Sequence, residues 1–312
     1  MKHNKADDID GWLVIDKPRG MGSTQVVGKT RYLLHANKNG HTGTLDPFAT
    51  GVLPIAFGEA TKLVPFVTDG EKEYEFVVEW GKATDTGDTE GKIIATSDKI
   101  PNREEILATI PHFIGKIKQI PPMYSAIKIN GREAYKLARQ GQTVAMPERE
   151  IEIYELELLE EYTKSAKFRV RCSKGTYVRT LGADMAKYLG SEGYLSELRR
   201  TKCGNFSLKS TILLDSLEKV EYIDKRRKLL LPIETSLRDI AEIAVSAEDA
   251  RKLSMGQGLS PKSYPTVKPT ELAAAMFCNC LIALVRIDER KISPVRVFHN
   301  IIKKELTDVD NK

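Results

Sequence analysis

The sequence contains no apolar run of about 18 residues, the length that a membrane-spanning helix needs. Its first residues are polar and include no apolar stretch of the kind that directs secretion. It also contains no internal repeat and no low-complexity tract, which excludes repeat architectures and compositionally biased proteins. These absences lead us to expect a cytoplasmic globular protein without membrane contact.

Cysteine is scarce as well. The four cysteines include no CxxC pair, and no histidines stand at the spacing of a zinc site. Cys278 and Cys280 are separated by one residue, and we interpret them as small strand residues that remain reduced in the cytosol. We therefore expect no structural metal.

Positive charge is in modest excess. The 312 residues carry a net charge of +5, which suits a nucleic-acid-binding protein without requiring one, and their number allows one large domain and a smaller one. Residues 112–140 contain six Lys or Arg and a single acid, whereas residues 148–161 contain seven Glu. Such segregation is expected when one face meets phosphates, although a solvated charged face explains it equally well.

Strands and helices are mixed without a regular βαβ repeat, which favours an α+β fold over a doubly wound sheet. Ser23 or Thr24 is the expected N-cap of the first helix, and Asn102 with Glu105 forms a capping box for another. The remaining elements follow from period-2 and period-3.6 patterns: strands at 12–15, 74–80, 166–172, 280–287 and 295–299, and helices at 26–34 and 178–189.

A segment from Gly40 to Pro54 combines one carboxylate with one histidine, three glycines and two prolines. It is too broken for a strand and too short for a helix, so we expect a rigid loop or a tightly turned strand end. Asp46 precedes Pro47, which pushes its backbone to an extended conformation. The loop would then present a single acid, although an ordinary turn before proline gives the same dipeptide.

Several motifs, in order along the chain, resemble the TruB family of tRNA pseudouridine synthases, and the acid loop resembles the family's catalytic-aspartate motif. The other motifs are Trp12–Gly20 with Lys17-Pro18, Lys72-Glu73-Tyr74, Gln119–Lys128 followed by Gly131-Arg132 and Tyr135, Cys172–Arg179, and Leu198-Arg199-Arg200. The resemblance covers residues 11–238, and its order makes it specific.

The resemblance implies the pseudouridine synthase fold, a mixed and mostly antiparallel sheet flanked by helices. We expect a catalytic domain at residues 1–238, with a thumb-like loop at about 118–146. Residues 253–259, with Gly256-Gln257, resemble a turn of PUA-like domains. Residues 239–312 are therefore expected to form a small β-rich PUA-like RNA-binding domain.

The activity implied by the resemblance is isomerisation of uridine-55 in the tRNA T loop to pseudouridine, which needs no cofactor. Asp46 is the implied catalytic acid, and Arg179 is the cation that would keep it ionised. Tyr74 would stack on the uracil. Tyr177 would line the pocket and share in proton transfer, and Leu198 would form a pocket wall.

The target uridine must flip out of the folded RNA to reach such a site. His41 resembles the family's histidine that enters the space vacated by the flipped bases, whereas an ordinary turn histidine is the alternative. The other residues that we expect on the RNA side are Lys17, Lys128, Arg132, Lys174 and Arg199. We also expect Lys167, Arg169 and Arg171, on one face of a predicted strand, to hold phosphates.

Two other functions share this surface. One is a tRNA-binding folding chaperone without essential catalysis, against which the complete set of catalytic residues speaks. The other is a relative of the same fold that depends on a guide RNA. The compact chain with a long thumb-like segment favours a stand-alone enzyme, and we expect a monomer that binds the T stem-loop of tRNA without a guide.

Overall fold

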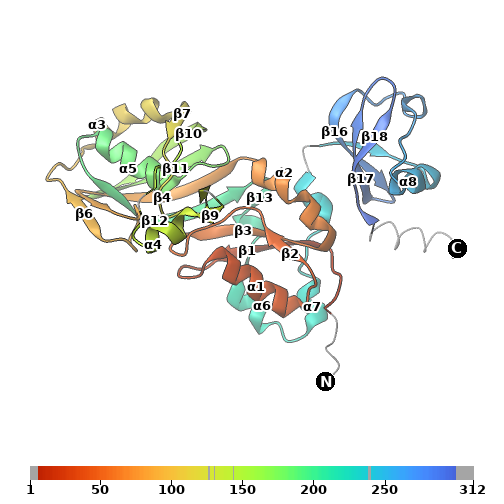
Figure 1. Cartoon of the computed structure of the whole chain (residues 1–312), viewed down its shortest axis with the longest axis horizontal. Helices are drawn as coiled ribbons and strands as arrows, with labels where there is room; N and C mark the ends of the chain where they lie inside the picture. Colours follow the sequence, from red (N-terminus) through yellow and green to blue (C-terminus); the bar gives the residue numbers. More distant parts are fainter. Residues whose placement is uncertain (1–5, 126, 130, 143, 238–239, 300–312) are drawn as a thin grey trace.

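One β-sheet of ten strands organises most of the molecule, and a second sheet of four strands lies beside it (Figure 1). The structure is a computed structural model that describes residues 6–299 except 126, 130, 143, 238 and 239. Along the large sheet the strands follow one another as β14 (Ile212–Leu213), β1 (Gly11–Lys17), β3 (Thr50–Phe57), β12 (Gly193–Cys203), β4 (Lys72–Trp80), β11 (Ser165–Cys172), β10 (Arg149–Glu161) and β7 (Gly115–Gln119). At its margins, β2 (Asn39–His41) pairs with β3 and β13 (Phe206–Ser207) with β12.

Most neighbouring strands of this sheet are antiparallel, but β12 and β3 run parallel, as do β1 and β14. Two hairpins stand apart from the sheet, one of β5 (Lys82–Thr84) with β6 (Ile93–Thr96) and one of β8 (Lys128–Ile129) with β9 (Arg132–Glu133). The second sheet has the order β15 (Ala241–Ala244), β16 (Thr270–Phe277), β17 (Cys280–Ile287) and β18 (Ile292–Val297). This architecture is the expected α+β class, with a large mixed sheet and a small C-terminal sheet.

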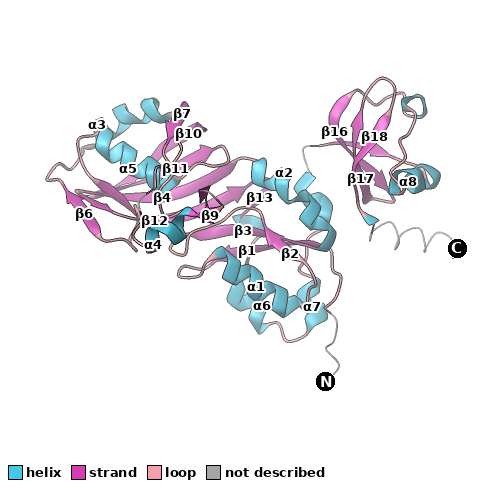
Figure 2. Ribbon diagram, viewed as in Figure 1, coloured by secondary structure: helices cyan, strands magenta, loops and turns pink. Residues whose placement is uncertain are grey.

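Helices cover the large sheet in groups (Figure 2). The α-helices are α1 (Ser23–Leu34), α2 (Val64–Asp69), α3 (Arg103–Thr109), α4 (Ala134–Arg139), α5 (Val178–Tyr188), α6 (Leu214–Lys219), α7 (Ile223–Arg227) and α8 (Ala247–Ser254). The 3-10 helices are η1 (Gly58–Leu63), η2 (Ile110–Phe113), η3 (Leu208–Ser210), η4 (Ile233–Leu237) and η5 (Pro261–Ser263). None of the helices in the described part of the chain has the length and apolarity that a bilayer crossing demands.

Strand alternation determines which side of the sheet becomes the core. Tyr74, Phe76 and Val78 of β4 are buried in one cluster with residues of α1 and α5, because successive side chains of a strand point to opposite faces. Phe168 of β11 joins this layer and stacks on Phe76 with ring centroids 5.4 Å apart. The predicted strands at 74–80 and 166–172 are thus confirmed.

The opposite face of the same strands carries charged side chains. Lys167, Arg169 and Arg171 lie on this face, as the alternation predicted, but each is paired with a carboxylate from a neighbouring segment. Lys167 bonds Glu75 at 3.0 Å, and Arg171 bonds both Glu71 and Glu155. The three positive charges are thus paired within the protein and lie on the face away from Tyr74, and the expectation that they hold phosphates stays a prediction.

Helix caps agree with the sequence in one case and differ in another. Asn102 accepts a hydrogen bond from the Glu105 amide, and the two form the predicted capping box of α3. The N-cap of the first helix is Gly22, one residue before Ser23 and two before Thr24, the two expected caps. Ser23 is inside the helix, and its hydroxyl bonds the backbone of Leu45 instead. That hydroxyl therefore serves the acid loop rather than the helix.

The C-terminal sheet packs against the first part of the chain through a continuous apolar cluster. Phe298 is fully buried in a cluster that also contains Leu63 of η1 and Leu237 of η4. Lys62 donates a hydrogen bond to the Val297 carbonyl at 2.7 Å, and its ammonium lies 5.6 Å from the centre of the Phe298 ring. The contact is therefore apolar at its centre, and the Lys62 ammonium lies at its edge.

Truncating this contact should weaken the whole protein. We expect Phe298→Ala to lower the free energy of unfolding by about 3 kcal/mol, because it leaves a cavity where the ring was. Urea unfolding followed by far-UV circular dichroism measures the change. Val295→Ala, at a position 44% exposed, is the matched control and should cost little. Equal losses in the two variants would show that the apolar cluster does not hold the two sheets together.

Candidate active site

The loop between β2 and β3 carries Asp46, and its backbone is fixed on both sides of that residue. The Ser23 hydroxyl accepts from the Leu45 amide at 2.8 Å and donates to the Leu45 carbonyl at 2.9 Å. On the other side, the Gly20 amide donates to the Pro47 carbonyl at 2.8 Å. The predicted loop presenting one acid occupies only the middle of the segment 40–54, because residues 40–41 end β2 and residues 50–54 begin β3.

Lys17 also belongs to this scaffold. Its side chain is fully buried, and its ammonium donates to the carbonyls of Pro18, Met21 and Pro47. Burial lowers the pKa of Lys17 to about 8, and the negative charge of Asp46 opposes that change. The structure thus places Lys17 beneath the acid loop, where any effect on RNA would act through the loop rather than by surface contact.

Asp46 forms an ion pair with Arg179, the cation that the sequence suggested. The Nε of Arg179 lies 2.9 Å from Oδ2 of Asp46, and the arginine side chain is 4% exposed. Arg179 stands in the first turn of α5, directly after Tyr177-Val178, so the ion pair joins the helix to the acid loop.

The same guanidinium binds two further segments. Its Nη1 donates to the Thr86 carbonyl at 2.6 Å and lies 3.5 Å from the Asp88 carboxylate. Its Nη2 donates to the Tyr124 carbonyl at 2.8 Å. Arg179 therefore connects the acid loop, the loop between β5 and β6, and the base of the thumb-like loop.

The protonation of Asp46 reflects opposing effects. Burial raises its pKa above the usual range, and the charge of Asp88 raises it further, whereas Arg179 and Lys17 lower it. Asp88 was not among the residues that the sequence suggested, although it lies in the turn-rich segment 84–91. Its effect becomes visible only when the fold brings that segment to Arg179.

A cavity of about 260 Å³ opens beside this ion pair. Tyr74 of β4 and Leu198 of β12 line it, as does Tyr177 at the start of α5. Burial raises the pKa of Tyr74 to about 12, so its phenol is neutral at pH 7. The structure thus brings Asp46, Tyr74, Tyr177, Arg179 and Leu198 together around one space.

Arg200 lines the same cavity, although its part in the site was not predicted. It is 1% exposed, donates to the carbonyls of Val52 and Gly43, and its charge opposes the rise in the pKa of Tyr74. Gly51, opposite Arg200 in the parallel pairing, has φ +103°, and a Cβ there would lie 2.2 Å from the Arg200 carbonyl oxygen. The period of two from Leu198 would have placed Arg200 on the pocket side.

Gln119 is a second residue that sequence reasoning did not single out. It is 3% exposed, accepts from the Tyr177 amide at 2.8 Å, and donates to the Tyr177 carbonyl at 3.1 Å. The two bonds fix the main chain of Tyr177 at the root of the thumb-like loop. Gln119 stands directly before Ile120-Pro121-Pro122 in the sequence. That position indicates where the thumb-like loop begins, but not that Gln119 contacts Tyr177.

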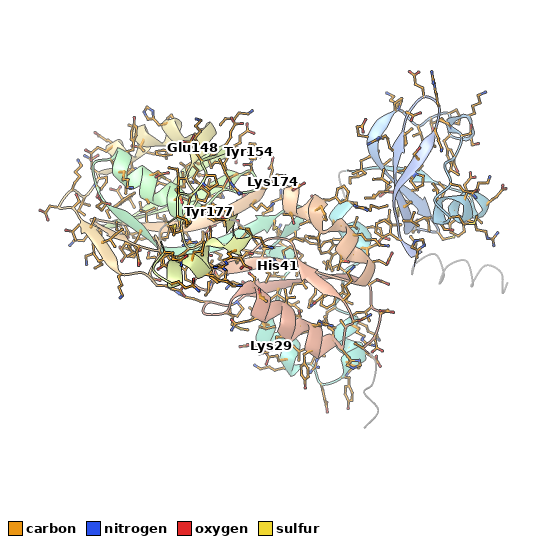
Figure 3. The ribbon with its side chains drawn as sticks, viewed as in Figure 1. Lys29, His41, Glu148, Tyr154, Lys174 and Tyr177 are labelled. Atoms are coloured by element: carbon orange, nitrogen blue, oxygen red, sulfur yellow. The ribbon has the colours of Figure 1, made fainter. Side chains whose placement is uncertain are left out.

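Two of the residues expected on the RNA side are near the cavity, Lys174 in its lining and His41 directly before the lining residue Thr42; Figure 3 labels both. His41 is half-buried, accepts from the Gly43 amide at 3.2 Å, and has its pKa lowered by burial. The neutral ring is therefore the favoured form. Lys174 lines the cavity and is paired with Asp69 at 2.9 Å, with both side chains well exposed.

The remaining three residues lie elsewhere. Lys128 and Arg132 are exposed on the β8–β9 hairpin of the thumb-like loop. Arg199 points to the other face of the sheet from Leu198, where it forms a two-pronged ion pair with Asp16 and also donates to Thr50. The structure does not bring Arg199 to the cavity.

The described site combines a carboxylate, two neutral phenols and an apolar wall beside a buried cation. A carboxylate held next to a guanidinium can attack carbon or remove a proton. The phenol rings and Leu198 offer surfaces on which a planar base can lie. Such a site suits chemistry at a nucleotide that has left its helix.

Comparisons with known proteins agree with this geometry. Residues 31–178 match the model of the TruB family pseudouridylate synthase N-terminal domain, and residues 179–238 match that of the tRNA pseudouridylate synthase B C-terminal domain. The tRNA pseudouridine synthase B of Caulobacter vibrioides is 44% identical over 305 residues, which cover 95% of this chain and 98% of that protein. That of Bradyrhizobium diazoefficiens is 46% identical over 302 residues, covering 94% and 86%.

Solved structures share the fold. A chain in the structure of an H/ACA RNP bound to a substrate RNA containing 2′-deoxyuridine superposes with a TM-score of 0.69 at 25% identity, covering 92% of this chain and 84% of that chain. A chain of a Cbf5-Nop10-Gar1 complex gives the same values. The chain therefore belongs to the TruB family of pseudouridylate synthases, which are isomerases, and has their mixed α+β fold.

Proposed function

We propose that this synthase converts uridine-55 in the T loop of tRNA to pseudouridine and that Asp46 is the group that reacts with the flipped nucleotide. The observation that carries the proposal is the ion pair of Asp46 with Arg179 at the mouth of a cavity lined by Tyr74, Tyr177 and Leu198. The relatives named tRNA pseudouridine synthase B support tRNA as the substrate.

The reaction breaks the bond between N1 of uracil and C1′ of the ribose. The base then turns, C5 bonds to C1′, the hydrogen on C5 leaves as a proton, and N1 takes up a proton. Atoms and electrons balance within one nucleotide, so the conversion needs no redox partner. Asp46 would either attack C1′ or remove a proton from the sugar, and both routes require an ionised carboxylate.

The surrounding groups would divide the remaining work. Tyr74 would stack on the uracil, Leu198 would close the other side, and Tyr177 would line the pocket and share in proton transfer. Arg179 would hold Asp46 in place and favour its charged form, which burial opposes. Lys17 would act indirectly, by fixing the backbone next to Asp46.

Contacts with the rest of the RNA would come from the margin of the cavity. His41 would fill the space left by the flipped bases, and Lys174 is exposed enough to exchange Asp69 for a phosphate. Lys128 and Arg132 would approach the T stem from the thumb-like loop. Arg199 would affect RNA binding only indirectly, through its ion pair with Asp16. The C-terminal domain, at residues 239–312, would add a PUA-like RNA contact.

A stand-alone monomer is the form that we propose, without a guide RNA. The chain aligns over 95% of its length with the Caulobacter protein at 44% identity, against 25% for the chain from the H/ACA RNP. Dependence of turnover on an added guide RNA would overturn this part of the proposal.

Replacing Asp46 by Asn should abolish turnover and leave tRNA binding intact. Tritium release from tRNA labelled at uridine C5 measures turnover, because forming the new C–C bond expels that hydrogen. Asp215→Asn, an exposed acid at the start of α6, is the control and should stay active. Turnover by Asp46→Asn would remove Asp46 from the mechanism, and a wild type that binds tRNA without release would favour the chaperone function.

The pH dependence of kcat/KM should follow the ionisation of Asp46. Burial raises the pKa of Asp46, and the reaction needs the ionised carboxylate. As the pH is lowered, kcat/KM should therefore begin to fall at a pH above about 3.9, the pKa of an ordinary aspartate. Asp88→Asn removes a charge that raises this pKa, so the acid limb should move to lower pH. A limb that stays in place or moves upward in Asp88→Asn would contradict the assignment.

Binding of tRNA should weaken with salt, because cations released from phosphates drive it. Removing both Lys128 and Arg132 by substitution with Ala should lower the affinity and reduce the slope of log K against log salt by about 1 to 2. Arg169→Ala, on the neutralised face of the sheet, is the matched control. Equal effects in the two variants would remove the thumb-like loop from RNA binding.

A further inference from the structure

Ser125 brings an unsatisfied hydroxyl from the thumb-like loop to the catalytic cavity. The residue is 5% exposed and lines the cavity together with Asp46 and Tyr177. Its Oγ is shielded from solvent and forms no hydrogen bond with any residue in the described ranges. Buried polar groups are nearly always bonded, and an orphan in a native protein requires an explanation.

The neighbour of this hydroxyl is the phenol of Tyr177. Burial raises the pKa of Tyr177, and the adjacent Ser125 hydroxyl opposes that rise, although the two oxygens do not have the geometry of a formed hydrogen bond. The main chain of Tyr177 is fixed by its two bonds to Gln119. Because the main chain of Tyr177 is held, the bond would form by movement of the Ser125 segment toward it.

The Ser125 segment is connected to the reacting groups. Arg179 donates to the carbonyl of Tyr124, one residue before Ser125, and the Tyr135 amide donates to the Ser125 carbonyl at 3.0 Å. A nucleotide entering the cavity would act on Arg179 and on this segment together. Hydrogen bonds that serve catalysis are often long or misaligned in the unliganded enzyme and tighten when substrate binds.

We propose that Ser125 is a positioning residue: when the target nucleotide fills the cavity, the Ser125 hydroxyl hydrogen-bonds to that of Tyr177 and fixes the direction of its proton. The inference rests on the proposed function of the site. The free protein leaves the hydroxyl unsatisfied, so Ser125 costs stability and acts only in the complex.

A double-mutant cycle tests the coupling. Single-turnover rates at saturating tRNA are measured for the wild type, Ser125→Ala, Tyr177→Phe and the double variant. Ser125→Ala should slow the wild type by about three- to tenfold, the worth of one neutral hydrogen bond, with little change in tRNA affinity. In the Tyr177→Phe background it should change the rate by less than about twofold. The same factor in both backgrounds, or no loss in the wild type, overturns the proposal.

Thermal unfolding of the free protein gives a second and independent test. Ser125→Ala should leave the Tm unchanged or raise it, because it removes an unsatisfied buried group. Ser191→Ala is the matched control: its hydroxyl is also buried but donates to the Lys99 carbonyl, so the Tm should fall while turnover is unchanged. An equal fall in Ser125→Ala shows that its hydroxyl already has a structural partner and overturns the proposal even where turnover cannot be measured.

Different results would contradict the proposed function and the role of Ser125. Absence of pseudouridine at uridine-55 after incubation with the unaltered protein would remove the proposed function. Normal product from the wild type, together with a rate that Ser125→Ala leaves unchanged, would remove the role of Ser125 alone.

Discussion

The ion pair between Asp46 and Arg179 is the interaction around which the site is built. A guanidinium that is 4% exposed must satisfy its donors within the protein, and it does so with one carboxylate at 2.9 Å and two backbone carbonyls. Those partners belong to three loops that are distant in sequence. Because leaving a buried cation unpaired is costly, Arg179 favours the arrangement in which all three loops meet at it.

The sheet supplies the frame that makes this meeting possible. Tyr74 and Leu198 face the cavity from β4 and β12, and the alternation of these strands also turns Arg200 inward and Arg199 outward. Arg200 then approaches the acid loop closely enough to bind the Gly43 carbonyl. Lys17 and Ser23 support the same loop from below. Rigidity around Asp46 therefore comes from buried polar groups that never need to touch RNA.

Local patterns predicted much of the fold because they depend on neighbours in sequence. The alternation at 74–80, the capping box at Asn102 and the helix after Tyr177 all appear as predicted. The first helix's cap differed, since Ser23 finds a tertiary partner in Leu45 that no local rule contains. The ion pairing of Arg169 was not predicted for the same reason: its charge was read from one strand, whereas its partner Glu157 lies on the neighbouring strand β10.

The residues of the candidate site fall into the same two groups, those suggested by local patterns and those whose roles depend on tertiary contacts. Motif order identified Asp46, Tyr74, Tyr177 and Arg179, and the fold places all four together. Asp88 was not predicted, and Gln119, Ser125 and Arg200 stood in the quoted motifs without a role, because each acts through a contact between segments far apart in the chain. Residue type alone does not reveal such contacts, and a single sequence contains no trace of them beyond strand alternation.

The most direct test of this account is the single-turnover rate and the tRNA affinity of Arg179→Lys, measured on the same preparation. Lysine keeps the charge but cannot bind Asp46 and two carbonyls in one plane. We predict a rate at least about 100-fold lower, with tRNA affinity nearly unchanged. A retained rate, or a loss confined to affinity, would contradict the claim that Arg179 holds the reacting carboxylate in place.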